Sequence, residues 1–513
     1  MRRTRNHLVA AAAGVVLALA APPVDAYPAL WIGMGALAWC LAEDPAWPAF
    51  ASNARVALTG ARRGLAFGAA ANLVALSFIP GVIARFTPLP WAAGVLALAL
   101  LALFEASRWM VACVACETLA RARVPRPVAF AAGVYAGTFV PTMLPWTVAG
   151  GISPWPAMVQ LADVFGERGV SFVMALTAGL AATGVRLAGA RVTRRRGAVL
   201  VAASAALVAV QAGAGAMRMR AVDAARAKAL RARVALLQPG IGASTRWEVD
   251  KAPDILEGLT ALTLRAEARG ADLVIWPEAA YPYRLPHGAR VEPPGAGAVL
   301  EPGVHGPVLT GLLTTGAPDG AAFNSALVAT RAGGLSTAYD KRHLLWFGET
   351  VPLADRLPWL RHVFARGLGL AAGNRSVTLV AGAIRAAPLI CYEDMLPEAG
   401  REAMGERPNL LVNITNDAWF GGAESELHLR MAALRAVEAR RDMVRAVNMG
   451  VSSWFDASGR LRARGAADLP GIVPAEPALL ETPDTLYVRF GDAPWALLAL
   501  LLANAAVWRA ARR

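Results

Sequence analysis

The chain has 513 residues, 56% of them hydrophobic and only 17% charged, whereas an ordinary soluble protein carries about 25% charged residues. Its formal net charge is +14, but no basic helix, aromatic stacking platform or zinc-ligand spacing accompanies that charge, which argues against a nucleic-acid partner. The four cysteines are too scattered for a disulfide framework, and the sequence indicates neither a metal site nor a cofactor.

Apolar stretches with the length of membrane-spanning helices fill residues 1–216 and recur at the C-terminal end. A helix needs about 20 residues to cross the bilayer core, and eight stretches reach or approach that length. The first has the charged start and apolar centre of a secretory signal, but further spans follow it at once, so we interpret it as a retained helix. The predicted spans lie near residues 7–22, 27–43, 64–85, 90–115, 127–145, 169–190, 197–216 and 493–509.

The arginines between these stretches predict the topology, because short cytoplasmic loops are the ones that carry Lys and Arg. Arginines cluster in every second loop, while the alternate loops contain only Arg168. Both ends of the chain are therefore expected inside, and the large segment after the seventh span outside. Residues 218–233 are an exception, since they carry six basic residues on the outer side, but the charge rule has little force before a large domain.

Residues 217–490 are typical of a layered α/β domain, in which apolar runs of strand length alternate with helix-period stretches. This divides the chain into a seven-helix bundle (1–216), the α/β domain (217–490) and a C-terminal membrane helix (491–513). Helices are expected over 252–268 and, as a long amphipathic helix, over 427–448. Strands are expected within 233–241, 271–279, 307–315, 323–341, 387–393 and 408–417, the fourth as a hairpin turning at Gly333-Gly334.

Three strand ends carry residues with catalytic chemistry: Glu278 in VIWPEAAYP, Lys341 in AYDKRHLLWFGETVP and Cys391 in LICYEDM. A thiolate is a nucleophile that a neighbouring cation favours, and a carboxylate can accept the thiol proton and return it to a leaving group. An ammonium can stabilise a tetrahedral oxyanion together with the backbone N–H of Tyr392. The three residues therefore predict acyl transfer.

Lysine usage singles out Lys341, because only three of the 51 basic residues are lysines, the others being Lys228 and Lys251. A compact ammonium at this position indicates a site that would not accept a flat guanidinium. Taken singly, a strand-end lysine is also explained as a solvated cap, and Cys391 as a small buried core residue.

Four motifs in order, WPEAAYP, YDKRHLLWFGETVPL, ICYED and NLLVNITNDAWFG, resemble the carbon–nitrogen hydrolase (nitrilase) superfamily. The flanking spans, with GGISPWPAMVQLADVFGERGVSF and LYVRFGDAPWALLALLL, narrow the resemblance to its apolipoprotein N-acyltransferase family. The resemblance implies an αββα sandwich beside a bundle of about eight transmembrane helices. It also implies a triad in which Glu278 is the general base, Lys341 stabilises the oxyanion and Cys391 is the nucleophile. Supporting residues implied by it are Glu349, Tyr392, Glu393 and Trp247, and the candidates for lining the route of the acyl chain are Trp346, Phe347 and Trp419.

By the same resemblance, Cys391 would take a fatty acyl chain from a membrane phospholipid, typically phosphatidylethanolamine, as a thioester. The N-terminal amine of a diacylglyceryl-cysteine in an apolipoprotein would then receive the chain as an amide. The implied setting is the bacterial inner membrane, crossed several times, with the catalytic domain on the periplasmic side. The protein is expected to be a monomer.

Two other functions stay open on the sequence. A membrane-anchored nitrilase-type amidase would hydrolyse small periplasmic amides, although a single span would anchor it. A transporter-like or structural protein with a degenerate domain would need polar residues deep in its spans, of which there are few, Glu105 among them.

His343 and His428 form no recognisable Cys–His motif with Cys391. The departures from the family pattern at Pro239-Gly240 and at 448–450 leave the donor and acceptor preference open.

Overall fold

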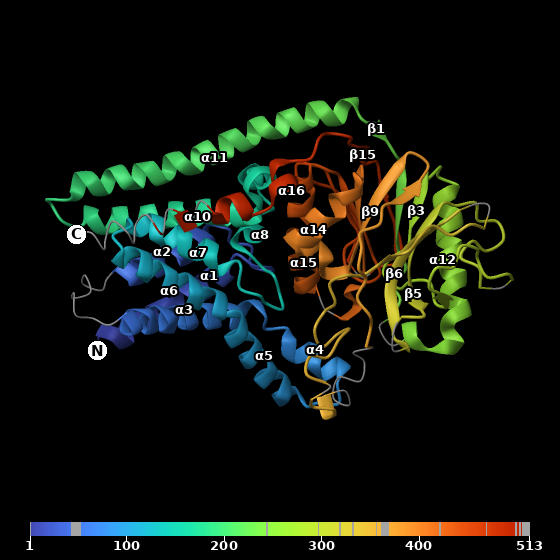
Figure 1. The fold of residues 1–513 in the computed structure, drawn as a ribbon, viewed down its shortest axis with the longest axis horizontal. Helices are drawn as coiled ribbons and strands as arrows, with labels where there is room; N and C mark the ends of the chain where they lie inside the picture. The colour runs from blue at the N-terminus through green and yellow to red at the C-terminus, as the bar shows by residue number, and fades with distance from the viewer. Residues whose placement is uncertain are drawn as a thin grey trace. The chain divides into compact units, whose positions relative to one another are not determined.

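The computed structural model describes residues 2–42, 53–242, 245–295, 297–317, 320–330, 333–354, 356–360, 369–419, 422–467, 469–497, 500–501 and 504. Over these residues the chain divides into two compact units (Figure 1). The first comprises 1–85, 89–218 and 489–513, and the second comprises 86–88 and 219–488.

The first unit is a bundle of helices that pack closely through small residues. Its helices are α1 (Arg2–Ala18), α2 (Pro28–Ala42), α3 (Asn53–Ala75), α4 (Ile79–Phe86), α5 (Trp91–Glu105), α6 (Ser107–Arg121), α7 (Arg126–Gly137), α8 (Val148–Ile152), α9 (Pro156–Val159), α10 (Ala162–Ala188) and α11 (Arg194–Lys228), whose last residues belong to the second unit. α1 packs on α2 and α3, and α6 packs on α3 and α7. A Cβ at Gly64 in α3 or Gly133 in α7 would collide with the backbone of α6, so glycine is what allows these helices to approach.

Three helical segments in the described part of the chain are long and apolar enough to cross a membrane: 91–121, 162–188 and 194–228. A fourth span is present if α3 and α4, which are bent by 54° at a short break, are counted as one. α1 and α2 are apolar but shorter. The predicted span at 493–509 falls mostly outside the described residues. The structure therefore supports three or four of the eight predicted spans by length and composition.

The predicted span at 127–145 is wrong in its second half, because α7 ends at Gly137. Its 12 residues are about 18 Å long, too short for a bilayer core of about 30 Å. Pro141 and Pro145 explain the end, since proline lacks the N–H that continues a helix. The sequence of 127–145 indicates its apolar composition correctly, but not the end of the helix within it.

Glu105 and Arg108 satisfy the non-helical backbone that follows α7. The N–H groups of Met143 and Leu144 donate to Glu105 Oε1 at 2.8 and 3.0 Å, and the Arg108 guanidinium donates to the carbonyls of Leu144 and Trp146. Irregular backbone in an apolar environment is tolerated only where its polar groups find partners within the protein. The acidic residue that would have favoured a transporter thus has a structural role.

The second unit contains two sheets at its centre. Among the described residues, one has seven strands: β14 (Gly471–Ala475), β2 (Val234–Gln238), β3 (Leu273–Ile275), β5 (Val308–Thr315), β6 (Ala322–Ala329) and β7 (Tyr339–Asp340) in this order, with β4 (Arg284–Pro286) paired to β5. The other has six: β13 (Leu461–Arg464), β12 (Ser453–Phe455), β11 (Met443–Val447), β10 (Leu410–Thr415), β9 (Ile384–Ile390) and β8 (Leu379–Ala381). A small pair joins β1 (Leu230–Arg231) to β15 (Ala478–Leu479).

The two sheets face each other and are covered by helices, as the resemblance implied. Apolar residues of both sheets, among them Leu236, Ile275, Ile390 and Val412, form one buried cluster between them. α12 (Ala252–Glu267) covers the outer face of the seven-stranded sheet, and α14 (Pro397–Ala403) with α15 (Gly422–Ala439) covers the six-stranded sheet (Figure 1). The last helix with printed bounds is α16 (Leu486–Phe490).

Parallel strands at the centre of each sheet bring their carboxyl ends to the same edge. β2, β3 and β5 are parallel neighbours, and so are β9, β10 and β11. Both faces of these strands are buried, which explains their nearly continuous apolar sequences. Glu278 and Cys391 both follow such strand ends.

The long helix predicted over 427–448 is wrong after residue 439. α15 ends at Ala439, and Arg440 has a left-handed φ of +51°. β11 then begins at Met443 and is buried at every residue between β10 and β12. Burial between two strands overrides a sequence pattern that continues to look helical.

Candidate active site

Cys391 lies at the carboxyl end of β9, where it begins a short 3-10 helix, η4 (Cys391–Met395). Its φ is +56°, a conformation that costs a non-glycine residue about 1–3 kcal/mol and is concentrated at functional sites. The Asn413 side chain donates to the Cys391 carbonyl at 2.9 Å, and the N–H of Ile390 donates to Glu393 Oε2 at 2.8 Å. Neighbouring strands thus hold the strained turn that carries the thiol.

Glu278 follows β3, and its carboxylate is buried and held from two sides. Oε1 accepts from Asn324 Nδ2 at 2.7 Å, and Oε2 accepts from the N–H of Asn416 at 3.0 Å. Asn324 lies in β6, whereas Asn416 follows β10 in the opposite sheet. Because each oxygen has its own donor, the carboxylate has a fixed orientation.

Lys341 follows β7 and is buried between two carboxylates. Its Nζ lies 2.8 Å from both oxygens of Glu349 and 3.7 Å from Glu278 Oε1. Asn324 Nδ2 also donates to Glu349 Oε1 at 3.1 Å and so bridges the two carboxylates. On another side, the Nζ lies 5.4 Å from the centre of the Tyr392 ring. The ammonium is therefore fixed in place by contacts from several sides.

Burial raises the pKa of the Glu278 carboxyl group, and although Lys341 opposes the rise, Glu349 adds to it. A carboxyl group whose pKa moves toward neutrality is a better general base at physiological pH. Burial opposes the charge of Lys341, but Glu349, Cys391 and Glu278 together hold the pKa of its amine well above the usual value. Lys341 therefore stays an ammonium.

The pKa of the Cys391 thiol is raised well above its usual value. Burial is the largest cause, and the charges of Glu278, Glu349 and Asp417 add to it, while Lys341 alone lowers it. Lys341 favours the thiolate, as the sequence predicts for a neighbouring cation, but desolvation and three carboxylates outweigh this one ammonium. The sulfur keeps its proton until a base removes it.

Glu393 ties the segment 341–343 to the turn of Cys391. Its Oε1 accepts from the N–H groups of the last two residues of that segment at 2.9 and 3.1 Å, and its Oε2 accepts from the Tyr339 hydroxyl at 2.9 Å. Glu393 is fully buried. The predicted supporting residue therefore fixes the backbone on both sides of the site.

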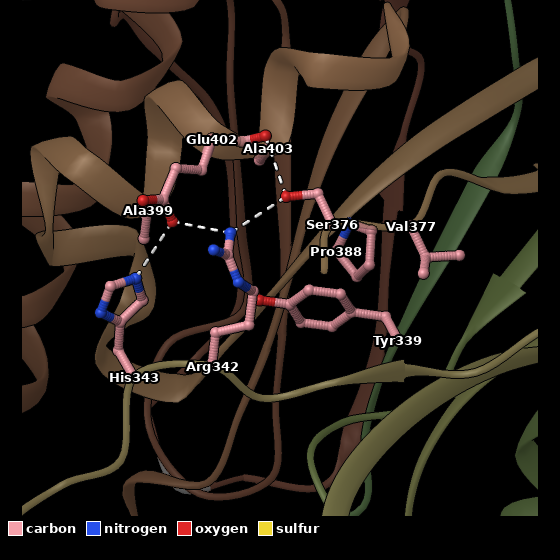
Figure 2. A pocket seen from close by; sticks show the side chains of 9 residues that line it. All are labelled: Tyr339, Arg342, His343, Ser376, Val377, Pro388, Ala399, Glu402 and Ala403. Carbon is pink, nitrogen blue, oxygen red and sulfur yellow. Dashed lines mark hydrogen bonds and ion pairs between the residues drawn. The ribbon is translucent and has the colours of Figure 1, made fainter. Parts of the chain in front are cut away.

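Glu402 on α14 holds the same segment from a second direction (Figure 2). Its Oε2 lies 2.7 Å from Arg342 Nη1 and 3.3 Å from His343 Nε2. Arg342 also donates to the Ser376 hydroxyl at 3.2 Å, which in turn donates to the Glu402 carbonyl at 3.0 Å. These side chains line a narrow recess together with Tyr339. These side chains therefore anchor the segment that begins at Lys341.

The predicted aromatic residues lie in loops and short helices. Trp346 and Phe347 belong to the loop between Lys341 and Glu349; the Trp346 side chain is exposed, and Phe347 has a φ of +63°. Trp247 and Trp419 end the 3-10 helices η1 (Thr245–Trp247) and η6 (Asp417–Trp419), but their side chains lie outside the described part. Within that part, no group of three or more His, Cys, Asp or Glu side chains is arranged to hold a metal ion.

Sequence reasoning missed the amides that hold the site. Asn324 interrupts the apolar strand FNSALVA, and Asn448 Nδ2 donates to Asn416 Oδ1 at 3.0 Å and to the Ile241 carbonyl at 2.7 Å. The N–H of Gly240 also donates to the Asn448 carbonyl, so the two departures from the family pattern contact each other. An amide inside or directly after an apolar strand was the available signal, because a buried amide needs partners.

The chain matches two protein-family models. The model for carbon-nitrogen hydrolase covers residues 233–476, and the model for the apolipoprotein N-acyltransferase N-terminal domain covers residues 13–180. Among solved structures, an amidase of the nitrilase superfamily from Nesterenkonia is 18% identical and covers 52% of this chain and 96% of its own, with a TM-score of 0.37.

Several curated relatives match almost end to end, and all are named apolipoprotein N-acyltransferase. The Azotobacter vinelandii protein is 33% identical over 98% of this chain and 95% of its own length. The Bradyrhizobium diazoefficiens protein is 31% identical over 98% and 95%, and the Geobacter metallireducens protein is 30% identical over 96% and 94%. With this identity over nearly its whole length, the chain belongs to the apolipoprotein N-acyltransferase family.

Proposed function

We propose that this protein completes the lipidation of bacterial lipoproteins by moving a fatty acyl chain from a membrane phospholipid to an apolipoprotein. The acceptor is the free α-amine of an N-terminal diacylglyceryl-cysteine, and the donor is a phospholipid such as phosphatidylethanolamine. Membership of the family supports the reaction class, and the buried cluster around Cys391 supports its mechanism.

In the first half-reaction, Cys391 Sγ attacks the ester carbonyl of the donor while its proton moves to Glu278. The oxyanion of the tetrahedral intermediate accepts from the Lys341 ammonium and the N–H of Tyr392. Collapse breaks the ester C–O bond, and the leaving lysophospholipid oxygen takes the proton from Glu278. A thioester on Cys391 and a lysophospholipid result.

In the second half-reaction, the amine of the acceptor attacks the thioester and gives a proton to Glu278. The C–S bond breaks, the sulfur recovers a proton, and the acyl chain leaves as an amide. Because two bulky lipids use one site in turn, a covalent intermediate removes the need to hold both at once. Trp346, Phe347 and Trp419 are proposed to line the route of the acyl chain.

We propose the following arrangement for these steps. Residues 1–216 and 491–513 lie in the inner membrane, which they cross several times, and residues 217–490 form the catalytic domain on the periplasmic side. The chain acts as a monomer. Two substrates that are anchored in the bilayer explain why a domain of this kind is joined to so much apolar sequence.

One observation carries the proposal: a half-buried thiol on a left-handed turn shares its electrostatic surroundings with the ammonium of Lys341 and the carboxylate of Glu278, and its pKa is raised. A thiol of this kind reacts only where a base and an oxyanion donor are already in place. The same cluster would serve an amidase, so the acyl donor and the acceptor have to be tested directly.

Intact mass spectrometry of the purified, full-length protein provides the test. After incubation with phosphatidylethanolamine, we expect one added fatty-acyl mass, located on the peptide that contains Cys391, and its loss when a diacylglyceryl peptide is added. The Cys391→Ser variant is the control, and it should form no thioester because it lacks the sulfur. Release of ammonia from small amides, with no acyl-enzyme from phospholipid, would contradict the proposal and favour the amidase.

A further inference from the structure

His428 lies in α15 with both ring nitrogens against buried carboxylates. Its Nε2 lies 2.6 Å from Asp394 Oδ1, and its Nδ1 lies 3.2 Å from Asp417 Oδ1. Asp394 Oδ2 also accepts from Arg445 Nε in β11 at 2.9 Å. All four side chains are buried, with His428 only 6% exposed.

The geometry requires a charged imidazole ring. A neutral histidine can donate from only one ring nitrogen, whereas two carboxylates facing both nitrogens need two donors. Burial and the Arg445 guanidinium oppose the charge, but Asp394 and Asp417 outweigh them and raise the pKa of His428 to about 9. The cluster therefore contains two carboxylates, one imidazolium and one guanidinium, which balance in charge.

Each carboxylate that contacts His428 belongs to a turn that carries part of the reacting site. Asp394 lies in η4, the turn that begins at Cys391. Asp417 directly follows Asn416, whose N–H donates to Glu278. His428 is thus the one-residue link between the turn of the nucleophile and the turn that orients the base.

The charge of Asp417 is the one that His428 has to compensate. Its Oδ2 is buried and has no hydrogen-bond partner, and its negative charge acts on the Cys391 thiol. The other charged groups that act on that thiol are Glu278, Glu349 and Lys341. Without the imidazolium, Asp417 would oppose the thiolate at full strength.

We propose that His428 is a positioning residue that, as an imidazolium, ties the Cys391 turn to the Asn416–Asp417 turn and neutralises Asp417 so that the thiol can be deprotonated. No sequence motif indicated this role. The inference rests on the proposed function only in taking Cys391 as the nucleophile. It predicts how easily the Cys391 thiol loses its proton, and this can be measured without any lipid.

The test is the rate at which iodoacetamide alkylates Cys391 in the full-length protein between pH 7.5 and 9.5, followed on the Cys391 peptide by mass spectrometry. In His428→Gln we expect alkylation at a given pH to slow about tenfold, the change for a shift of about one unit in thiol pKa. In His428→Gln/Asp417→Asn the rate should return to that of the wild type. His305→Gln, at an exposed loop position, is the matched control and should not change the rate.

Three results would overturn the inference: an unchanged rate in His428→Gln, a slow rate that Asp417→Asn does not restore, or the same slowing in His305→Gln. If His428→Gln does not fold, Asp417→Asn alone decides, because removing that carboxylate should speed alkylation several-fold. A rate that stays unchanged in Asp417→Asn then contradicts the role. Failure of Cys391 to load from phospholipid would contradict the proposed function and leave these alkylation rates as they are.

Discussion

At the residue scale, the proposed reaction depends on a proton acceptor for Cys391, because the pKa of its thiol is raised. Glu278→Gln keeps the size of the side chain but removes that acceptor, so we expect thioester formation to slow by about 10²–10⁴. The measurement is the rate at which the acyl-enzyme mass grows after phospholipid is added. Glu257→Gln, on the exposed side of α12, is the matched control and should load normally. An acyl-enzyme formed at the normal rate by Glu278→Gln would remove Glu278 from this role.

Lys341 provides a second prediction, because the space around its ammonium is already occupied. With Nζ at 2.8 Å from both oxygens of Glu349, a guanidinium of the same charge would have to displace its neighbours. Lys341→Arg should therefore lower kcat by about 10²–10³, the loss expected for one oxyanion donor. Lys251→Arg, at a partly exposed lysine, should retain full activity. Equal activity in the two variants would show that position 341 requires only a positive charge.

The raised pKa of His428 predicts how the stability of the folded protein depends on pH. The folded-state pKa of about 9 lies above the unfolded value of 6.5, so the stabilisation is fully present below about pH 6.5 and is lost as pH rises through 9. We expect the difference in Tm between the wild type and His428→Gln to shrink from pH 6.5 to pH 9.5. A difference that is constant over this range would mean that the imidazole is not charged in the folded protein.

The sequence indicated the candidate catalytic residues but not the amide side chains that hold them. Glu278, Lys341 and Cys391 stand out because each ends an apolar strand. Asn324, which bridges two carboxylates, gives no such signal, since one amide inside a strand does not show which distant side chain it will meet. Contacts across the two sheets depend on register, and register is not visible in a single sequence.

At the scale of elements, the end of α15 shows how burial decides between helix and strand. The expected helix continued through 440–448, but Asp442 and β11 join the sheet instead. Asp442 is a fully buried hub: it accepts from Arg226 at 2.9 and 2.8 Å and from Trp454 Nε1 at 3.0 Å. Partners so distant in the chain leave no local pattern, which is why the helix–strand boundary could not be found from the sequence.

Two of the Arg–Asp pairs in this unit, one buried and one exposed, allow a matched prediction. Asp442→Asn removes the carboxylate that binds buried Arg226 through two nitrogens and leaves Asp456, 3.7 Å away, as an ion-pair partner. We expect the free energy of unfolding to fall by about 3–5 kcal/mol. Asp272→Asn breaks the exposed pair with Arg233 and should cost less than about 1 kcal/mol. Thermal unfolding in detergent compares the two. Equal losses would mean that the Asp442 network does not stabilise the fold.

At the scale of the whole molecule, the α/β sandwich was predicted correctly and the bundle only in outline. Spans were read from apolar length, which does not reveal a break such as the one at Gly137. Three of the six basic residues of 218–233 have carboxylate partners. Arg218 contacts Asp163 at 2.6 Å, Arg226 pairs with Asp442 and Arg233 pairs with Asp272, so each of these charges is held by the protein.

The proposed topology predicts opposite labelling of two exposed positions. Val192 is 97% exposed in the arginine-rich loop between α10 and α11, and Val291 is 72% exposed in the second unit. In intact spheroplasts, a maleimide that does not cross membranes should label Val291→Cys and leave Val192→Cys unlabelled until the membrane is opened. The reverse pattern would place the catalytic domain in the cytoplasm and contradict the proposed location.

The raised pKa of the Cys391 thiol also bears on how long the enzyme would stay active. Peroxides and disulfides react with thiolates far faster than with thiols, so a sulfur that stays uncharged between turnovers is a poor target for oxidants. We therefore expect the same desolvation to slow the conversion of this sulfur to sulfenic acid. Such protection would matter most to a nucleophile that works outside the reducing interior of the cell.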